Sequence, residues 1–421
     1  MDVFWANTIL IIASVALCCS SLGRFRTPYN SHLSFPLFMI SWLTSELAWL
    51  HFLLQGAACI FLLISHSFQF WQVQVAFALL VASMFLLLSM HRISLQTGRI
   101  FKQHFTALFG DDYPQRVAAH RQHYIAHRHH PRYWLRPFSM RAPNVVRHRD
   151  LAYGDDTRQT LDIYHSHTNQ EGKLPVMLYI HGGGWIVGNK SQQALPMIYH
   201  LASKGWVVVT INYRLGPKSR FPDPLIDAKR ALAWVKNNIE GYGGDANFVV
   251  TSGGSAGGQL ALMLAQSCDS KWQPGFEKED TQVAACVPLY AVYDFTNQHR
   301  FRTDNTFEKF LTRFVMPSSL TEGSTLWHSL SPIHQLHARI PPMLTIHGSH
   351  DSLVPIEEAR EFANCVKKVS HNVNMFVELE ATQHAFEIFH SVRTEFTIDA
   401  IQLFLEIIYQ DYAQSIEHQS V

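Results

Sequence analysis

The chain has 421 residues and a formal net charge of +1. This length exceeds that of one average domain, and the near-neutral charge argues against nucleic acid or an acidic polymer as a partner. The first 91 residues contain long apolar runs with very few charges, whereas the rest has the composition of an ordinary globular protein. We therefore expect a membrane part followed by a soluble part.

Three segments of the membrane part are long enough to cross a bilayer, which requires about 20 apolar residues in a helix. They are Val3–Ser20, Pro36–Ile64 and Phe70–Met90. The second is longer than one crossing needs, so it either tilts or begins later. It also contains Glu46 and His51, and such groups at membrane depth usually face a bundle interior or an interface. We expect them to form hydrogen bonds between helices rather than a functional site.

The first apolar segment is predicted to be a retained helix rather than a cleaved signal peptide. A signal peptide has a basic region before its apolar run and small residues at its cleavage site. Here the chain starts Met-Asp, and Arg24 and Arg26 follow the apolar run. A lipoprotein site is not expected either, because Leu17 rather than Gly or Ala precedes Cys18.

The basic residues that flank the three segments predict their orientation, since short loops rich in Lys and Arg stay in the cytoplasm. Arg24 and Arg26 follow the first segment, and Arg92, Arg99 and Lys102 follow the third, whereas the loop "SHSFQF" carries neither Lys nor Arg. With three spans, the N-terminus lies outside and everything after the third span lies in the cytosol. If Pro36–Ile64 were instead a re-entrant hairpin, the middle segment would not cross and the basic flanks would fall on opposite sides. A reducing compartment also fits the odd number of cysteines beyond the membrane part: Cys268, Cys286 and Cys365.

A connector rich in Arg and His, residues 92–147, joins the two parts. His127, His129 and His130 suggest a metal site, but no cysteine or acidic cluster accompanies them and neighbouring arginines would repel a cation. Arginines and aromatic residues just beyond a membrane helix fit a segment that lies on anionic headgroups. No metal and no cofactor is therefore predicted.

From about residue 151, short runs rich in Val and Ile alternate with segments that have helical periodicity. This alternation predicts an α/β fold with a mostly parallel sheet covered on both faces by helices. Ligands of such sheets bind at the carboxyl ends of the strands. The predicted strands are 159–165, 174–180, 206–213, 248–252, 283–290, 342–348 and 374–380, and helices are predicted at 192–203, 224–238, after Ser255 and at 394–412.

Ser255 is the candidate nucleophile. It lies in Gly253-Gly254-Ser255-Ala256-Gly257, a G-x-S-x-G sequence between the strand "FVVTS" and the helical segment "QLALMLA". This is the context of a nucleophile elbow, in which a sharp turn strains the serine and side chains on its neighbours would clash. The helix that follows directs its positive end toward developing negative charge.

A serine hydroxyl needs a base, usually a histidine oriented by a carboxylate. In this type of fold the chain order is Ser, acid, His. Asp351, in "HGSHDSLVP", is the predicted acid, and Asp294 is the alternative. His384 follows the last predicted strand, and its loop adjoins that of Asp351 if the last two strands are neighbours. It is therefore chosen as the base over four other histidines: His347, His350, His371 and His390.

The sequence "HGGGWIVG", beginning at His181, is the candidate oxyanion hole. Three glycines after a buried strand allow the loop to approach a substrate and to turn its amides inward. Gly183 and Gly184 are the predicted donors, together with the amide of Ala256, and removing one such donor typically costs about 10²–10³ in kcat. His181, Gly182 and Trp185 complete the motif. A phosphate-binding loop is not expected, because its glycine-lysine signature is missing.

These motifs, with "NYRLGPKSRFPDPLIDAKRALAWVKNNIEGYGGD", resemble the hormone-sensitive-lipase branch of the α/β-hydrolases over about residues 150–412. The apolar N-terminus makes the chain similar to membrane-anchored carboxylesterases of bacteria, such as the mycobacterial ones. Gly254 departs from the branch, which usually has an acidic residue or Thr there. The resemblance implies a substrate cap over about 295–330, to which residues 92–147 are a candidate contribution.

The predicted organisation is a three-helix transmembrane region (1–91), the connector (92–147), an α/β-hydrolase domain (148–412) and a tail (413–421). The predicted function is that of a membrane-anchored serine carboxylesterase acting on short to medium acyl esters, with a small-molecule or lipid ester and the bilayer as partners. Two alternatives stay open: a hydrolase of membrane-embedded lipid or prenyl esters, and an inactive ligand-binding protein on the same fold. The second alternative is disfavoured because Ser255, Asp351 and His384 are all present. Oligomeric state is not predicted.

Overall fold

The computed structural model of the protein describes residues 31–119, 121–122, 133, 135–167, 173–267 and 270–419, with residues 8, 11, 12, 14, 15, 18, 19 and 21–25 nearer the N-terminus. The first predicted span therefore lies largely outside the described residues. Cys268 and the three histidines of the connector, His127, His129 and His130, also lie outside them.

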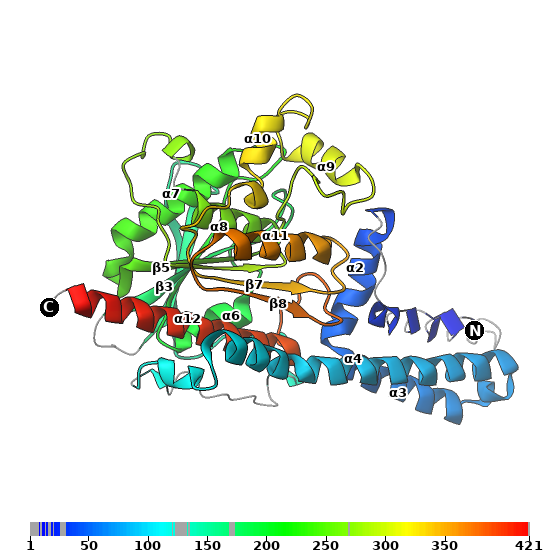
Figure 1. The fold of residues 1–421 in the computed structure, drawn as a ribbon. Helices are drawn as coiled ribbons and strands as arrows, with labels where there is room; N and C mark the ends of the chain where they lie inside the picture. Colours follow the sequence, from blue (N-terminus) through cyan, green and yellow to red (C-terminus); the bar gives the residue numbers. More distant parts are fainter. Residues whose placement is uncertain are drawn as a thin grey trace.

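An eight-stranded sheet forms the centre of the body, with the strand order β1-β2-β4-β3-β5-β6-β7-β8 (Figure 1). Strands β3 to β8 pair in parallel, whereas β2 pairs antiparallel with both β1 and β4. The middle strands are almost entirely buried, which explains their continuous apolar runs. The strands are β1 (Val145–Ala152), β2 (Thr160–Ser166), β3 (Leu174–Ile180), β4 (Val207–Ile211), β5 (Gly244–Gly254), β6 (Ala285–Leu289), β7 (Met343–Gly348) and β8 (Asn374–Leu379).

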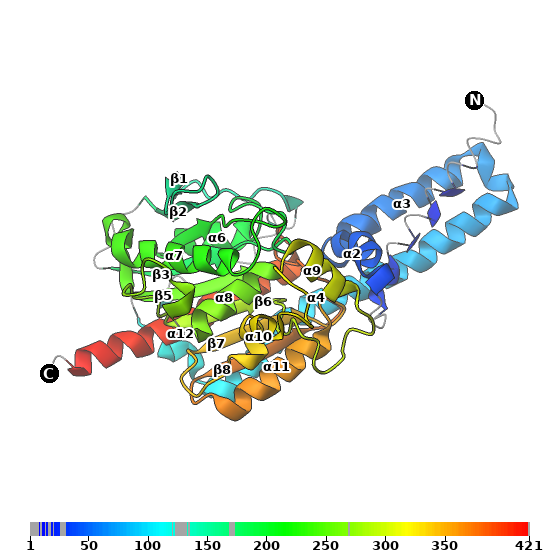
Figure 2. The same ribbon diagram turned by 90° about the horizontal axis from the view of Figure 1, so that it is seen from above.

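Helices cover both faces of the sheet (Figures 1 and 2). One face packs against α7 (Asp223–Asn238), α8 (Ala256–Gln266) and α11 (Ile356–Val369). The other face packs against α6 (Leu195–Ser203), α12 (Val392–Gln419) and the end of α4 (Trp71–Phe109). The predicted α/β fold with two covered faces is therefore confirmed.

Several elements differ from the predicted ones. Strand β1 and helix α11 were not predicted, and α12 continues through most of the predicted tail, 413–421. Helix α4 crosses the predicted boundary between the membrane region and the connector at residue 91. Its final turns belong to the body, where Phe101 and Phe105 are buried in the core beside α12. The sequence pattern did not reveal this, because an apolar helix that leaves a membrane and one that enters a core look alike.

The segment predicted as one membrane helix, Pro36–Ile64, consists of two helices. Helix α2 (Ser31–Glu46) and helix α3 (Ala48–Ile64) meet at Leu47 and differ in direction by 90°. Of the two expectations for this segment, a tilted helix and a helix that begins after Pro36, the structure fits the second, since α3 begins at Ala48. Among the described residues, only α4 is by itself long and apolar enough to cross a membrane, and α2 and α3 meet that criterion only when counted together.

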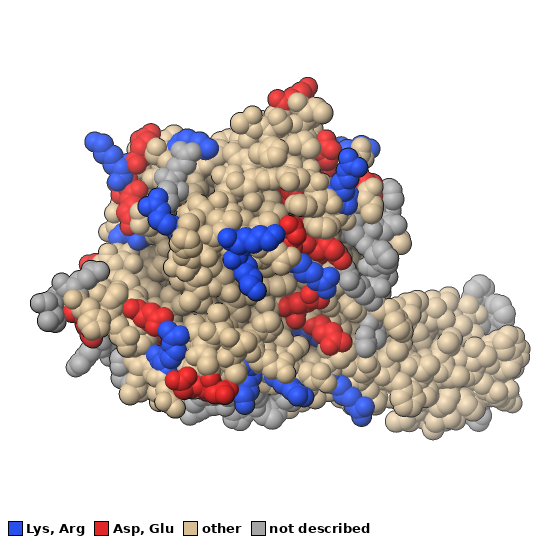
Figure 3. Space-filling model, in the orientation of Figure 1, with Lys and Arg blue, Asp and Glu red and all other residues tan. Residues whose placement is uncertain are grey.

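Helix α3 and residues 71–91 of α4 lie side by side and project from the body (Figures 1 and 2). We call this pair the apolar arm. Residues 47–91 contain no Asp, Glu, Lys or Arg, and Figure 3 shows the arm without charged side chains beside a body that carries many. Large apolar side chains are exposed on the arm, including Ile64 and Phe85. An exposed apolar surface of this extent is typical of an interaction site.

Helix α2 lies against the body rather than in the arm. Glu46, at its last residue, is buried and pairs with Arg393 of α12. We expected Glu46 to form a hydrogen bond to another helix of the membrane region. Its partner instead belongs to α12, a helix of the α/β body almost 350 residues further along the chain.

Candidate active site

Ser255 occupies the sharp turn between β5 and α8. Its backbone angles are φ 56° and ψ −122°. A positive φ in a residue with a side chain is strained and persists only where the surroundings enforce it. The Ser255 amide donates to the carbonyl of Leu289 at the end of β6, over 3.0 Å. The serine is therefore held by the neighbouring strand at the carboxyl edge of the sheet, as the elbow motif predicts.

The glycines around Ser255 are required by close approach. A Cβ on Gly257 would lie 2.0 Å from the carbonyl oxygen of Ile180, and one on Gly253 would lie 2.5 Å from the Gly257 carbonyl carbon. A Cβ on Gly254 would lie 2.3 Å from the hydroxyl of Tyr290. The departure at Gly254 from the usual acidic residue or Thr thus has a steric cause, because Tyr290 fills that space.

Asp351 and His384 are brought together by the neighbouring strands β7 and β8. The Nδ1 atom of His384 lies 2.6 Å from Oδ2 of Asp351, and both side chains are buried. The other carboxylate oxygen accepts the backbone amides of Leu353 and Val354 over 2.9 and 2.8 Å. The carboxylate is thus fixed by its own loop and in turn fixes the orientation of the imidazole.

Charge in the Asp351 pocket favours the ionised carboxylate. Burial alone would raise the pKa of Asp351, but the electrostatic interaction with His384 and hydrogen bonds from His347 and His384 lower it far below its usual range. His347 was another candidate base. Its Nε2 lies 3.2 Å from Oδ2 of Asp351, the oxygen that also contacts His384, and 3.1 Å from the Val354 carbonyl. His347 is fully buried in β7, so it supports the Asp351 carboxylate from within the sheet.

Tyr290 links the serine side of the site to the histidine side. Its hydroxyl packs against Gly254, and its ring centroid lies 4.5 Å from that of His384. The hydroxyl also bonds to Glu387, whose carboxylate lies 3.4 Å from the Tyr179 hydroxyl. Burial raises the pKa of Glu387. Sequence reasoning missed this cluster, because nothing local marks a tyrosine after a strand as a neighbour of the elbow.

The glycine-rich loop after β3 lies directly against the elbow. A Cβ on Gly182 would lie 3.0 Å from the Cβ of Ser255, and its amide is occupied by Gln193 at 2.6 Å. Gly183 and Gly184 follow with φ of 114° and 59°, which favour glycine. This arrangement leaves the amides of Gly183 and Gly184, with that of Ala256 at the start of α8, as the candidates for an oxyanion hole.

The remaining motif residues hold the loop in place. The Trp185 Nε1 donates to Gln259 of α8 over 3.2 Å, which joins the loop to the elbow helix. His181 stacks on Tyr213 at 4.5 Å between centroids, and its Nδ1 lies 2.7 Å from the Gly182 carbonyl. Burial lowers the pKa of His181 to about 4, so its ring is neutral near pH 7. His181 is therefore a structural residue of the loop.

The alternative acid, Asp294, has a different set of partners. Its carboxylate accepts the amides of Thr296 and Gln298, both over 2.7 Å, and lies 3.8 Å from His334. It shapes its own loop and does not pair with His384. Among the other candidate histidines, His390 pairs with Glu395 over 2.5 Å and so belongs to a different cluster.

The predicted cap segment, 295–330, contains the short helices α9 (Thr306–Phe314) and α10 (Ser324–Ser329). Phe310 of α9 lies over the glycine-rich loop, with its Cζ 3.3 Å from a Cβ placed on Gly184. The site is also covered from the N-terminal side by α2, since Phe38 contacts His384 edge-on with centroids 6.0 Å apart. No sequence signal assigned 31–46 to the site, because the segment reads as membrane-spanning.

A cavity of about 600 Å³ lies elsewhere. Its lining includes Tyr133, Arg136 and residues 139–144, parts of α6 with Lys204, and His390, Glu395 and Asp399. Ser255, Asp351 and His384 are not among its lining residues, so this cavity is separate from the candidate active site. Within the described part of the chain, no three His, Cys, Asp or Glu side chains are grouped so that they could hold a metal ion.

Comparison with known proteins identifies the family. The BD-FAE family model matches residues 161–366. The chain is 42% identical over 263 residues to the probable carboxylic ester hydrolase LipM of Mycobacterium tuberculosis, covering 62% of this chain and 61% of LipM. It is 34% identical over 278 residues to the esterase LipC of the same organism, covering 66% and 69%. The chain belongs to the α/β-hydrolase family of these esterases. The predicted resemblance to mycobacterial carboxylesterases is thereby confirmed, and the match spans about three fifths of the length of LipM.

A solved esterase structure has a similar fold to this chain. The butyrate-bound esterase Est2 of Thermogutta terrifontis superposes with a TM-score of 0.51 and 25% identity, covering 66% of this chain and 95% of Est2. The apolar arm and α2 both precede residue 161, where the match to the family model begins.

The pairing of Asp351 with His384 predicts that Asp351→Asn lowers kcat by orders of magnitude, on the order of 10⁴ in the analogous serine-protease case. The amide would leave the imidazole in the wrong tautomer for accepting a proton. The matched variant Asp294→Asn should keep kcat within a few-fold of the unmodified enzyme. Steady-state hydrolysis of a p-nitrophenyl ester measures both, and a near-normal Asp351→Asn with an inactive Asp294→Asn would reverse the assignment.

Proposed function

We propose that the protein is a membrane-anchored serine carboxylesterase in which Ser255, His384 and Asp351 form the catalytic triad. The observation that carries the proposal is the 2.6 Å contact between His384 and Asp351, next to a strained serine elbow and a glycine-rich loop. The names of the related proteins LipM and LipC support the reaction class.

The proposed chemistry follows from which atoms of these residues are not engaged by other protein groups. Because Nδ1 of His384 is engaged by Asp351, Nε2 is the atom that accepts the Ser255 proton as the hydroxyl attacks the ester carbonyl. The ionised Asp351 stabilises the imidazolium that results. The developing oxyanion is bound by the amides of Gly183, Gly184 and Ala256, at the positive end of α8.

Collapse of the tetrahedral intermediate expels the alcohol, which takes its proton from Nε2 of His384 and leaves an acyl-enzyme on Ser255. Water then attacks the acyl group while the same nitrogen accepts a proton, and the acid is released. Every proton moves between Nε2 and an oxygen of substrate, serine or water. The proposed sequence needs no metal or cofactor.

The variant Ser255→Ala is expected to abolish ester hydrolysis and labelling by a fluorophosphonate probe, because both need the serine oxygen. Thermal unfolding and gel filtration of the purified variant in detergent should match the unmodified protein, since alanine fits the turn. Persistent labelling of Ser255→Ala would show that another residue is the nucleophile.

The substrate is expected to be an ester with a short to medium acyl chain, since α9 and α2 both cover the site. A second candidate is an ester embedded in the bilayer. It is favoured by the outer side of α2, where Phe35 and Met39 are 61% and 52% exposed close to the Phe38 that contacts His384. Both candidates share the triad and differ in how the substrate reaches it.

Chain length distinguishes these candidates. We expect kcat/KM for p-nitrophenyl esters to be highest for short and medium acyl chains and to fall for long ones. The measurement is repeated with esters dissolved in phosphatidylcholine vesicles carrying the full-length protein. Faster turnover of long-chain esters in the vesicles than of short-chain esters in solution would favour the bilayer-embedded substrate.

The apolar arm is proposed to anchor the protein in the membrane. Helix α3 has 17 residues and is about 25 Å long, close to the lower limit for a crossing, and α4 is longer. Helix α3 runs away from the body and α4 runs back toward it. The start of α3 and the end of the apolar part of α4 therefore lie on the same side of the membrane as the α/β body. Together with a first span at 3–20, this gives three crossings with the basic flanks and the body in the cytosol.

Fusion of a reporter to the C-terminus tests this orientation. We expect fluorescence from a reporter that matures only in the cytosol, and no activity from one that works only outside it. The matched fusion of each reporter at residue 67, in the loop between α3 and α4, should give the opposite pattern. External activity of the C-terminal fusion would overturn the proposed topology.

A further inference from the structure

Helix α2 makes direct contacts with the loop that carries His384. The Trp42 indole Nε1 donates to the carbonyl of Ala385, the residue after His384, over 2.8 Å. Gln383 precedes His384, and the Nε2 of its side-chain amide donates to the Ser41 hydroxyl over 3.0 Å. Phe38 meets the imidazole edge-on. Three successive loop residues, 383–385, therefore each have a partner on this helix.

The Gln383 side chain extends this connection to the acid loop. Its carbonyl oxygen accepts the backbone amide of His384 over 2.9 Å and that of Ser352 over 2.8 Å. Ser352 follows Asp351 directly, and its hydroxyl donates to the carbonyl of Ser34 at the start of α2 over 2.9 Å. Gln383 and α2 thus clamp together the two loops that supply the acid and the base.

The histidine loop needs such support because its backbone is strained. Ala381 and Ala385 both have positive φ, of 50° and 58°, although neither is glycine. Residues in this region persist only where the surrounding structure fixes them. The carbonyl of Ala385 also lies in a buried part of the loop, and the Trp42 N–H is the donor that satisfies it.

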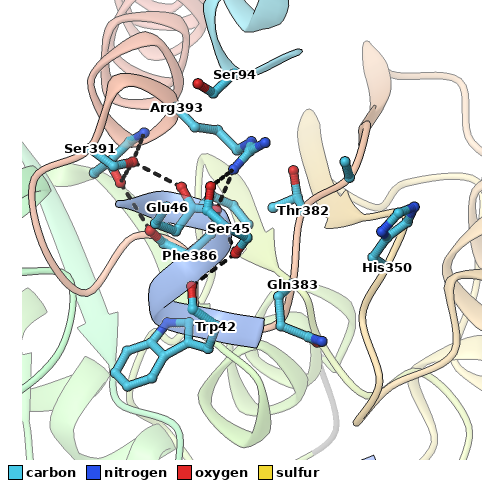
Figure 4. A network of polar contacts seen from close by, with 12 residues as sticks. Trp42, Ser45, Glu46, Ser94, His350, Thr382, Gln383, Phe386, Ser391 and Arg393 are labelled. Atoms are coloured by element: carbon cyan, nitrogen blue, oxygen red, sulfur yellow. Dashed lines mark hydrogen bonds and ion pairs between the residues drawn. The ribbon is translucent and has the colours of Figure 1, made fainter. Parts of the chain in front are cut away.

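A buried ion pair fixes α2 on the body. Arg393 bonds to Glu46, and Ser391 donates to the other Glu46 oxygen over 2.9 Å (Figure 4). Figure 4 shows this cluster beside Gln383 and Trp42, at the end of the histidine loop. Losing one partner of a buried pair strands the other charge, which is strongly destabilising. The position of α2, and with it Trp42, is therefore set by the body rather than by the arm.

We propose that α2 is a positioning element of the active site, in which Trp42 and Ser41 hold the His384 loop so that the imidazole keeps its productive orientation. The inference rests on the proposed esterase function. It assigns a role in catalysis to a segment of the apolar N-terminal region, which reads from the sequence as membrane anchor alone. Only Leu47 separates α2 from the apolar arm. The helix that contacts the His384 loop is therefore joined directly to the proposed membrane anchor.

The test is the full-length variant Trp42→Phe, which keeps an aromatic ring for the contacts with Phe38 and Phe389 but removes the N–H donor. The matched control is Trp71→Phe, the same substitution at an exposed position at the outer end of the arm. We expect Trp42→Phe to lower kcat about 3- to 10-fold, the range for one hydrogen bond, with KM unchanged. The rate of fluorophosphonate labelling should fall in parallel, because it depends on the base and not on ester binding.

Three outcomes contradict the inference. Rates of Trp42→Phe equal to those of Trp71→Phe would show that the bond does not position the histidine. A change in KM with kcat unchanged would make α2 a part of the substrate pocket only. A wild-type protein that neither hydrolyses esters nor reacts with the probe would contradict the proposed function itself, and the inference with it.

A second pair of variants decides the matter if Trp42→Phe does not fold. Ser41→Ala removes the acceptor for Gln383, whereas Ser41→Thr keeps the hydroxyl. A kcat lowered in Ser41→Ala and restored in Ser41→Thr, at equal thermal stability, supports the positioning role. Equal kcat in both variants contradicts it.

Discussion

The close approach of two backbone segments, the end of β3 and the start of α8, is the constraint on which the candidate site depends. At Gly257 the space for a side chain is taken by the carbonyl oxygen of Ile180, which lies only 2.0 Å from where a Cβ would stand. This proximity places the glycine-rich loop after β3 beside Ser255. In the proposed mechanism, this proximity lets the amides of Gly183 and Gly184 bind the oxygen of the carbonyl group whose carbon Ser255 attacks. The glycines are thus required by the close packing of two backbone segments, and the proposed chemistry uses the contact that results.

The strain of this arrangement is distributed over several anchors. Ser255 is held by the Leu289 carbonyl, and the glycine-rich loop by Gln193 and by Trp185 through Gln259. Each anchor comes from a different element, so the serine does not rely on its own turn. For the nucleophile proposed here, such rigid positioning means that little free energy is lost to reorganisation during the reaction, which is the physical basis of preorganised catalysis.

On the histidine side the support comes from an unexpected part of the chain. The loop around His384 is strained, and its partners are Asp351, Gln383 and the helix α2. That helix would be expected in the membrane from its composition, yet its end is drawn to the body by the ion pair of Glu46 with Arg393. A charge that would be costly in a bilayer is here placed where a partner compensates it. The chain bends at Leu47, directly after this ion pair, and residues 47–91 beyond the bend contain no Asp, Glu, Lys or Arg.

The sequence by itself determined the local chemistry. Strands appear as runs of Val and Ile, and the elbow appears as small residues around Ser255. The proposed acid and base, Asp351 and His384, follow successive strands. Each of these features is set by neighbours within a few residues. The tertiary structure decided the rest. It decided that Tyr290 fills the space at Gly254, that Glu46 meets Arg393, and that α2 leaves the predicted span to cover His384. These contacts join residues that are tens to hundreds of positions apart, and burial of complementary groups at such distances leaves no periodic pattern in the sequence from which it could be predicted.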